Sequence, residues 1–132
     1  MKRTKNPAKE AEYRKRAADL VAQMTLHEKV SQMLSWAPAI ERLGIPAYNW
    51  WSEGIHGVGR ADTATVFPQA IGMAAAFDED MMEQVGNAVG VEARGKYNMC
   101  RAHGDRDIFK GLTVWAPNIN IFRDPRWGRG HE

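Results

Sequence analysis

AYNWWSEGIHG, residues 47–57, is the stretch that decides the fold class of this 132-residue chain. Its first five residues form a short, largely aromatic run after the turn Leu43-Gly44-Ile45-Pro46, and such a run predicts a buried strand. Residues 52–65 contain three glycines among polar residues and predict a loop. The sequence therefore predicts a strand whose carboxyl end opens into a polar loop.

A long helix and a second strand are expected after this loop. Asp78 has the position of an N-cap before a helical pattern that runs to about Met99. Residues 112–115 form another short apolar run, which predicts a second strand. A strand, a crossover helix and a strand make a βαβ unit, which implies a parallel sheet. The fold class expected from these elements is α/β.

The first third of the chain is expected to be helical. Apolar residues recur at helical spacing in residues 8–24. The sequence Thr25-Leu26-His27-Glu28 has the form of a capping box, and a second helix is expected after it with its apolar side chains turned inward. We therefore divide the chain, treated as one partial domain of residues 1–132, into a helical segment of residues 1–45 and a βαβ portion of residues 46–132.

Composition indicates a folded globular chain without a metal or cofactor site. Hydrophobic residues make up 44% and charged residues 26% of the sequence, close to the usual values, so disorder is not expected. The single cysteine, Cys100, excludes an internal disulfide and a thiolate metal site built from this chain alone. The histidines are widely scattered and none has a second histidine at metal-ligand spacing. We expect no cofactor and no metal.

Neither a membrane nor a nucleic acid is the expected partner. No apolar run approaches the roughly 20 residues of a membrane-spanning helix. The basic N-terminus is not followed by the apolar segment of a secretory signal, so a cytoplasmic location is expected. The basic residues near the start are interleaved with Glu10 and Glu12. Such interleaved charge favours a solvated helix over a nucleic-acid-binding arm.

Two polar side chains in the first loop are candidates for ligand binding. Glu53 closely follows the predicted strand, and function in parallel α/β folds sits beyond the carboxyl ends of strands. Its carboxylate could accept hydrogen bonds from two vicinal hydroxyls, or it could simply pair with a nearby arginine. His56 is a candidate because histidine is a common acid–base group, but a loop histidine bonded to a backbone carbonyl is the favoured interpretation.

The closing stretch WAPNINIFRDPRWGRGHE, residues 115–132, has the composition of a polar binding loop. It carries arginines at every third position, namely Arg123, Arg126 and Arg129. Arginine forks suit carboxylates, phosphates and pairs of hydroxyls, and one of them is expected to pair with Asp124. A phosphate site is not favoured, because no glycine-rich cradle precedes a helix here. Trp127 could stack on a sugar ring or fill the loop against the sheet.

Several motifs occur in one order along nearly the whole chain, from about residue 17 to residue 132. They are Met24-Thr25-Leu26, Leu43-Gly44-Ile45-Pro46, Trp50-Trp51-Ser52-Glu53 with His56-Gly57, Thr65-Val66-Phe67-Pro68-Gln69, Glu92-Ala93-Arg94 and, most specific of all, Pro117-Asn118-Ile119-Asn120-Ile121-Phe122-Arg123-Asp124-Pro125-Arg126-Trp127-Gly128-Arg129. Through these motifs the chain resembles glycoside hydrolase family 3, the β-glucosidase and β-xylosidase family. Several independent motifs in one order argue against a chance similarity.

The resemblance implies a (β/α)8 TIM-type barrel, of which this chain is the incomplete, helix-rich N-terminal portion with about two barrel strands. It also implies retaining, exo-acting hydrolysis of terminal β-linked sugars, in which an aspartate attacks the anomeric carbon and a glutamate acts as acid and then as base. Both residues, and the family's lysine–histidine sugar-binding pair, are expected beyond Glu132. The chain is therefore expected to hold no catalytic residue and to be inactive without the C-terminal remainder of the parent enzyme.

Within this chain the resemblance implies sugar binding by two residues. Glu53 and Arg129 are implied to hold hydroxyls of the sugar in the innermost subsite, with His56, Trp127 and Arg126 as weaker candidates. Many glucosidases of the family have Asp where Glu53 stands, and the longer side chain resembles the β-xylosidase and arabinosidase-like members. Such a difference can discriminate substrates by ~1–3 kcal/mol. The expected substrate is an oligosaccharide or an aryl or alkyl β-glycoside, and the alternative is a stand-alone carbohydrate-binding piece without catalysis.

Overall fold

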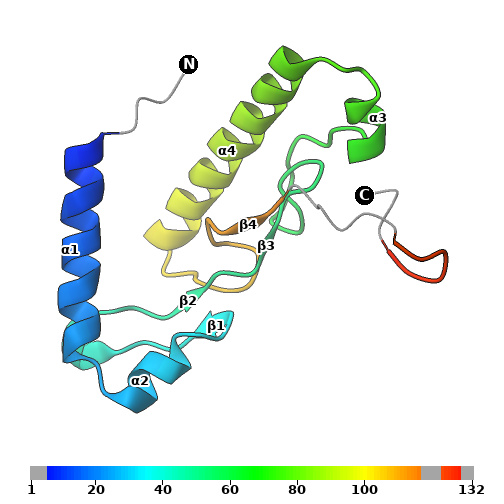
Figure 1. Ribbon diagram of the computed structural model, residues 1–132. Helices are drawn as coiled ribbons and strands as arrows, with labels where there is room; N and C mark the ends of the chain where they lie inside the picture. The colour runs from blue at the N-terminus through cyan, green and yellow to red at the C-terminus, as the bar shows by residue number, and fades with distance from the viewer. Residues whose placement is uncertain (1–5, 117–122, 129–132) are drawn as a thin grey trace. The chain divides into compact units, whose positions relative to one another are not determined.

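The computed structural model describes residues 6–116 and 123–128 (Figure 1). The chain divides into two units, Met1–Ala47 and Tyr48–Glu132. In the described residues helices predominate, and each strand is only two residues long. The fold is therefore a helix-rich α/β one, as the sequence predicts. No helix within these two ranges is both long enough and apolar enough to cross a membrane.

Helix α1 (Pro7–Gln23) is an exposed helix whose start is fixed by a cap. Asn6 Oδ1 accepts hydrogen bonds from the amides of Ala8, at 3.1 Å, and Lys9, at 3.3 Å. The surface of the helix carries i,i+4 ion pairs at 2.8 Å, which are Glu10–Arg14 and Lys15–Asp19. Over its described part, the basic N-terminal segment is thus a solvated helix.

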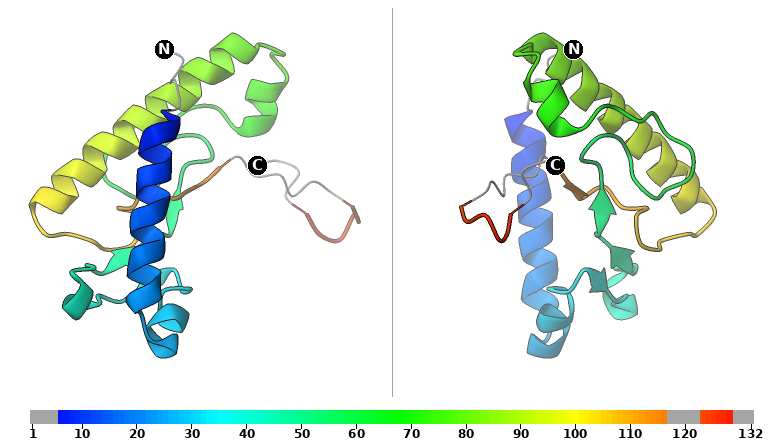
Figure 2. Two further views of the ribbon diagram at one scale, coloured as in Figure 1. Left: turned by 60° about the vertical axis from the view of Figure 1, so that its left-hand side comes forward. Right: turned by 90° about the vertical axis from the view of Figure 1, so that its right-hand side faces the viewer.

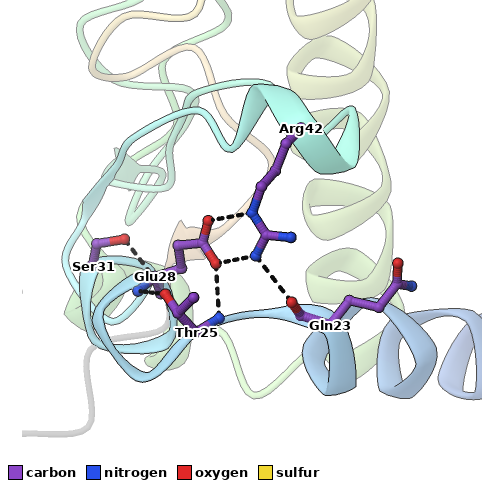
Figure 3. A network of polar contacts seen from close by, with 5 residues as sticks. All are labelled: Gln23, Thr25, Glu28, Ser31 and Arg42. Atoms are coloured by element: carbon purple, nitrogen blue, oxygen red, sulfur yellow. Dashed lines mark hydrogen bonds and ion pairs between the residues drawn. The ribbon is translucent and has the colours of Figure 1, made fainter.

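The predicted capping box is present and starts helix α2 (Leu26–Ser31). Thr25 Oγ1 accepts from the amide of Glu28 at 3.2 Å, and Glu28 Oε2 accepts from the amide of Thr25 at 2.8 Å (Figure 3). Arg42, from the 3-10 helix η1 (Glu41–Leu43), donates to the same carboxylate. These donors lower the pKa of Glu28 from 4.5 to about 2, and the hydrogen bond from Arg42 contributes most.

The apolar side chains of α2 and of the residues just after it do not turn inward as predicted. All four that were expected to turn inward are at least 55% exposed, namely Leu26, Val30, Met33 and Leu34. The capping box fixes where the helix begins, but the helix ends at Ser31 and is too short to form an apolar stripe. Among the described residues of this unit, the buried apolar ones are instead Ile40 and Ala37, which lies in strand β1 (Trp36–Ala37).

The second unit contains the predicted βαβ arrangement (Figures 1 and 2). Strand β3 (Ser52–Glu53) pairs in parallel with strand β4 (Val114–Trp115). Helices α3 (Ala70–Ala74) and α4 (Glu79–Ala102) separate the two strands in the chain. The parallel pair and the long crossover helix confirm the α/β prediction.

The strand predicted over residues 47–51 is displaced in the structure. Strand β2 (Tyr48–Asn49) ends early, and the parallel pairing forms further on, in β3. Asn49 Oδ1 accepts from the amide of Trp51 at 3.0 Å, so a local side-chain turn satisfies this backbone donor in place of a sheet. Glu53 is therefore the last residue of a strand and not a residue of the following loop.

Helix α4 begins where the sequence predicts and borders an apolar cavity. Asp78 Oδ1 accepts from the amide of Met81 at 2.9 Å, which caps the helix. The helix continues to Ala102, slightly past its predicted end. Small residues on α4, together with residues of α3 and β4, line a cavity of about 360 Å³; they include Gly86, Gly90, Ala93, Met73 and Val114.

Hydrogen bonds join the chain after α4 to β2 and β3. The amide of Leu112 donates to the hydroxyl of Tyr48 at 2.8 Å. The amide of Gly111 donates to the buried hydroxyl oxygen of Ser52 at 3.2 Å. A Cβ at position 111 would lie 2.7 Å from the carbonyl oxygen of Asn49, so glycine is required for this close approach. These contacts fix the carboxyl end of β3, where the predicted site lies.

Candidate functional site

Glu53 stands at the carboxyl end of β3, opposite Trp115 in the parallel register. Its side chain is 44% exposed. Its backbone carbonyl accepts from the amide of Gly59 at 2.9 Å, which folds the following loop back onto the strand. Arg60 Nε lies 3.3 Å from Oε2 of Glu53. The carboxylate thus pairs with an arginine and still remains open to a ligand.

The loop of residues 54–67 forms an open cavity of about 150 Å³ beside Glu53. Glu53, His56 and Arg60 are among the residues that line it. His56 is exposed, and its backbone carbonyl accepts from the amide of Phe67 at 2.8 Å, which joins the two limbs of the loop. The structure therefore brings two of the predicted site residues, Glu53 and His56, to one cavity.

Left-handed backbone conformations gather in and around this loop. Gly57 has φ 128°, Arg60 has φ 58° and Asp62 has φ 65°. For residues with a side chain such conformations cost on the order of 1–3 kcal/mol and concentrate at functional sites. The guanidinium of Arg60 also lies 5.4 Å from the ring centroid of Phe109, whose amide donates to the carbonyl of Trp51 at 2.9 Å. Arg60 is thus held between this ring and the carboxylate of the neighbouring strand.

Stacked tryptophan rings lie next to Glu53 in the chain and in the sheet. The ring of Trp115 lies 5.1 Å from that of Trp51 and 6.1 Å from that of Trp50, measured between centroids. Trp51 is 45% and Trp115 is 52% exposed, so the predicted burial of the first aromatic run is incomplete. An apolar surface with a few polar groups is typical of small-molecule sites. Trp115 is not among the ligand-binding residues predicted from the sequence, although its position at the end of the second predicted strand is a signal for it.

Helix α4 contributes two polar side chains to the same loop. Glu92 accepts from the amide of Thr65 at 3.0 Å and from its hydroxyl at 2.5 Å. These bonds, the hydroxyl first, lower the pKa of the Glu92 carboxyl. Lys96 donates to the carbonyl of Thr63 at 2.5 Å. Neither helix residue is among the site residues predicted from the sequence, although Glu92 lies in one of the family motifs.

The second predicted loop is described from residue 123 to residue 128. Arg126 binds Asp124 with two hydrogen bonds of 2.8 Å, from Nε to Oδ1 and from Nη2 to Oδ2. These bonds lower the pKa of the Asp124 carboxyl and raise the pKa of Arg126. The prediction that one arginine pairs with Asp124 is confirmed. Trp127 is 47% exposed, and the guanidinium of Arg123 lies 4.9 Å from its ring centroid.

Among the described residues, Arg126 and Trp127 are the other site candidates, and neither lines the cavity beside Glu53. Arg126 and Trp127 belong to the separate turn just described. Arg129 lies outside the described residues. Over residues 6–116 and 123–128, no group of three or more histidine, cysteine or acidic side chains is arranged to hold a metal ion.

The comparisons with known proteins agree on the family of this chain. Residues 15–132 match the family described as Glycosyl hydrolase family 3 N terminal domain. The chain is similar to Probable beta-D-xylosidase 7 of Arabidopsis thaliana, with 51% identity over 128 residues that cover 89% of this chain and 16% of that protein. It is similar to Xylan 1,4-beta-xylosidase of Xylanibacter ruminicola, with 46% identity over 121 residues, 90% of this chain and 14% of that protein.

A third relative has two activities in its name. Beta-xylosidase/alpha-L-arabinofuranosidase 2 of Medicago sativa subsp. varia is 45% identical over 127 residues, which cover 89% of this chain and 15% of that protein. The chain thus spans only 14–16% of the length of these three relatives. Both the family match and the identities extend over most of this chain, and the chain belongs to glycoside hydrolase family 3 through the N-terminal domain of that family.

Proposed function

We propose that this chain is the N-terminal, substrate-binding part of an exo-acting, retaining β-glycosidase with a β-xylosidase-like preference. The observation that carries the proposal is the half-exposed carboxylate of Glu53 at the carboxyl end of a parallel strand, beside an open cavity. Ligand sites of (β/α)8 barrels occupy this end of the strands. The relatives named above are β-xylosidases by name and support the same class of activity.

The surroundings of Glu53 suit a sugar ring. A carboxylate can accept hydrogen bonds from two vicinal hydroxyls, and such charge-assisted bonds are roughly twice as strong as neutral ones. The exposed rings of Trp51 and Trp115 offer apolar surface to the C–H groups of the sugar. His56, at the same cavity, is a further candidate for a hydroxyl contact.

The identity of residue 53 supports a preference for pentosides. Many glucosidases of the family have aspartate at this position, and Glu53 extends its carboxylate about one methylene further into the pocket. Xylose lacks the exocyclic hydroxymethyl group of glucose and so leaves more room for the longer side chain. A difference of this size discriminates substrates by ~1–3 kcal/mol, or about 10- to 200-fold in kcat/KM.

In the proposed mechanism this chain binds and orients the sugar, while the reacting carboxyl groups belong to the part of the enzyme after residue 132. A retaining enzyme holds its nucleophile and its acid/base about 5–5.5 Å apart, so that a covalent glycosyl-enzyme forms before water enters. Glu53, with Arg129 as the second proposed hydroxyl ligand, fixes the ring so that its anomeric carbon faces the nucleophile. Arg126 has a structural role, because its guanidinium is engaged by Asp124.

The test uses the protein encoded by the complete reading frame that contains residues 1–132. It is assayed with 4-nitrophenyl β-xyloside and 4-nitrophenyl β-glucoside, and we expect a preference for the xyloside. Glu53→Ala should lower kcat/KM about 100-fold or more, because two charge-assisted hydrogen bonds are removed. Glu83→Gln, a change at an exposed glutamate of α4, is the matched control and should have no effect. The 132-residue chain alone should show no turnover.

Three results would change the proposal. A strong preference for the glucoside would contradict the xyloside assignment. An inactive full-length protein, combined with millimolar sugar binding by the 132-residue chain that Glu53→Ala abolishes, would support a stand-alone carbohydrate-binding role. Turnover by the 132-residue chain would show that it contains the catalytic residues.

A further inference from the structure

A carboxylate on α4 holds the far limb of the loop of residues 54–67. Both oxygens of Glu92 are used by Thr65, one by its amide at 3.0 Å and the other by its hydroxyl at 2.5 Å. One helical turn further on, Lys96 donates to the carbonyl of Thr63 at 2.5 Å. We call these four residues, Thr63, Thr65, Glu92 and Lys96, the Glu92 clasp.

Short contacts connect the Glu92 clasp with the wall of the cavity. Gly57 lies so close to Thr65 that a Cβ on it would be 2.2 Å from the Thr65 carbonyl oxygen. On the other limb, Gly59 donates its amide to the carbonyl of Glu53 at 2.9 Å. A Cβ on Gly59 would meet the Glu53 side chain at 3.3 Å. The loop therefore has little freedom to shift at the clasp without disturbing the contacts around Glu53.

The loop needs hydrogen bonds from another element because its own sequence does not define one conformation. It contains three glycines, which lose the most conformational freedom on folding. Arg60 and Asp62 have left-handed backbone, and strained residues of this kind persist only where the surrounding structure over-determines them. The 24-residue helix α4, capped by Asp78, is the regular element that touches the loop at Thr65.

We propose that Glu92 is a positioning residue, which holds the loop of residues 54–67 against Glu53 so that this carboxylate faces the sugar. The inference rests on the proposed function. Glu92 is not one of the residues that line the cavity beside Glu53, so it acts through Thr65 and not by contact with the substrate. Specificity at the strand end therefore depends on a side chain of the crossover helix.

The structural arm of the test measures amide hydrogen exchange in the full-length protein, by mass spectrometry of the peptides that contain Thr65 and Phe67. Glu92→Gln should raise the exchange rates of the Thr65 and Phe67 amides about tenfold, because the charge-assisted acceptor is lost. Thr65→Val, which lacks the hydroxyl, should also raise these exchange rates. Thr65→Ser keeps a hydroxyl and should show the wild-type rates. Glu83→Gln is the matched control on the same helix and should leave the rates unchanged.

The functional arm uses the full-length protein and a double-mutant cycle with xyloside as substrate. Glu92→Gln should lower kcat/KM about tenfold in the wild-type background and should have almost no effect in the Glu53→Ala background. This loss of effect is expected only if Glu92 acts through Glu53, since a purely structural role would give additive losses.

The outcomes separate this inference from the proposed function. Unchanged exchange rates in Glu92→Gln, or additive losses in the cycle, would overturn the positioning role while leaving the hydrolase assignment intact. A wild-type protein without turnover would overturn the proposed function and, with it, the role of Glu92 in substrate binding. Faster exchange together with non-additive losses would support both.

Discussion

Replacement of Gly57 by alanine should open the loop of residues 54–67. Gly57 has φ +128°, and a backbone conformation of this kind costs a residue with a side chain about 1–3 kcal/mol. The new Cβ would also lie 2.2 Å from the carbonyl oxygen of Thr65, although Cβ atoms essentially never come within 3.0 Å of a non-bonded heavy atom. Thr65 cannot shift freely, because Glu92 binds both its amide and its hydroxyl. Strain and clash therefore act together.

The expected magnitude follows from these two terms. The strain contributes at least ~1 kcal/mol, and relief of the clash breaks at least one hydrogen bond of Thr65, worth ~1 kcal/mol or more. The closed loop should thus lose at least ~2 kcal/mol, which is about a 30-fold change in population. Amide exchange measured by NMR should be about 30-fold faster at Thr65 and at Phe67, whose amide donates to the carbonyl of His56 at 2.8 Å.

Gly95→Ala is the control substitution, and it should change stability in the opposite direction. Gly95 lies inside α4, and a Cβ there would meet nothing within 4 Å. Alanine should stabilise this helix by roughly 0.5–1 kcal/mol and leave the loop unchanged. Gly57→Ala with wild-type exchange at Thr65 and Phe67, in a chain that circular dichroism shows to be folded, would refute the reasoning.

Three further predictions concern the strand, the capping box and the substrate. Ser52→Ala should lower the free energy of unfolding in urea by about 1–3 kcal/mol, because the amide of Gly111 loses its buried acceptor; an unchanged urea midpoint would contradict this. Glu28 has its pKa lowered from 4.5 to about 2, so its contribution to stability is complete above pH 4.5 and is lost as the pH falls toward 2. Urea midpoints of wild type and Glu28→Gln should therefore converge in acid, and a constant gap would contradict the assignment. In the full-length protein, Glu53→Asp should raise the ratio of glucoside to xyloside kcat/KM about tenfold, whereas an unchanged ratio would remove residue 53 as the determinant.

The helix starts and the fold class could be predicted because their signals are local. The caps of α4 and α2 are made within three residues of chain, by Asp78 and by Thr25 with Glu28. The parallel pairing follows from the order of strand, helix and strand. The residue at which pairing begins could not be predicted. The partner of β3 is β4, which follows α4 in the sequence, so residues distant in the chain set the register.

In the candidate site, too, features with a local sequence signal could be predicted, and contacts between distant residues could not. Glu53 could be selected because it follows an aromatic run, and an arginine partner for Asp124 could be expected because Arg123 and Arg126 lie within two residues of it. Arg60 reaches the Glu53 carboxylate through a left-handed backbone conformation that its residue type does not signal. The contact between Glu92 and the loop depends on how α4 packs in the folded chain, so no local pattern reveals it.

The ion pair between Glu53 and Arg60 leaves the carboxylate available to the sugar of the proposed function. The two groups are 3.3 Å apart and largely exposed, with Arg60 at 70%, and exposed pairs of this kind are worth roughly 0–1 kcal/mol. A hydrogen bond from a hydroxyl to a charged group is worth about 1.5–3 kcal/mol, so two hydroxyls outweigh the pair. Arg60 need not leave, because the ring of Phe109, 5.4 Å away, keeps its guanidinium near the carboxylate. Since Arg60 is carried by the loop that Glu92 holds, the charge balance at Glu53 and the shape of the cavity are both set from α4.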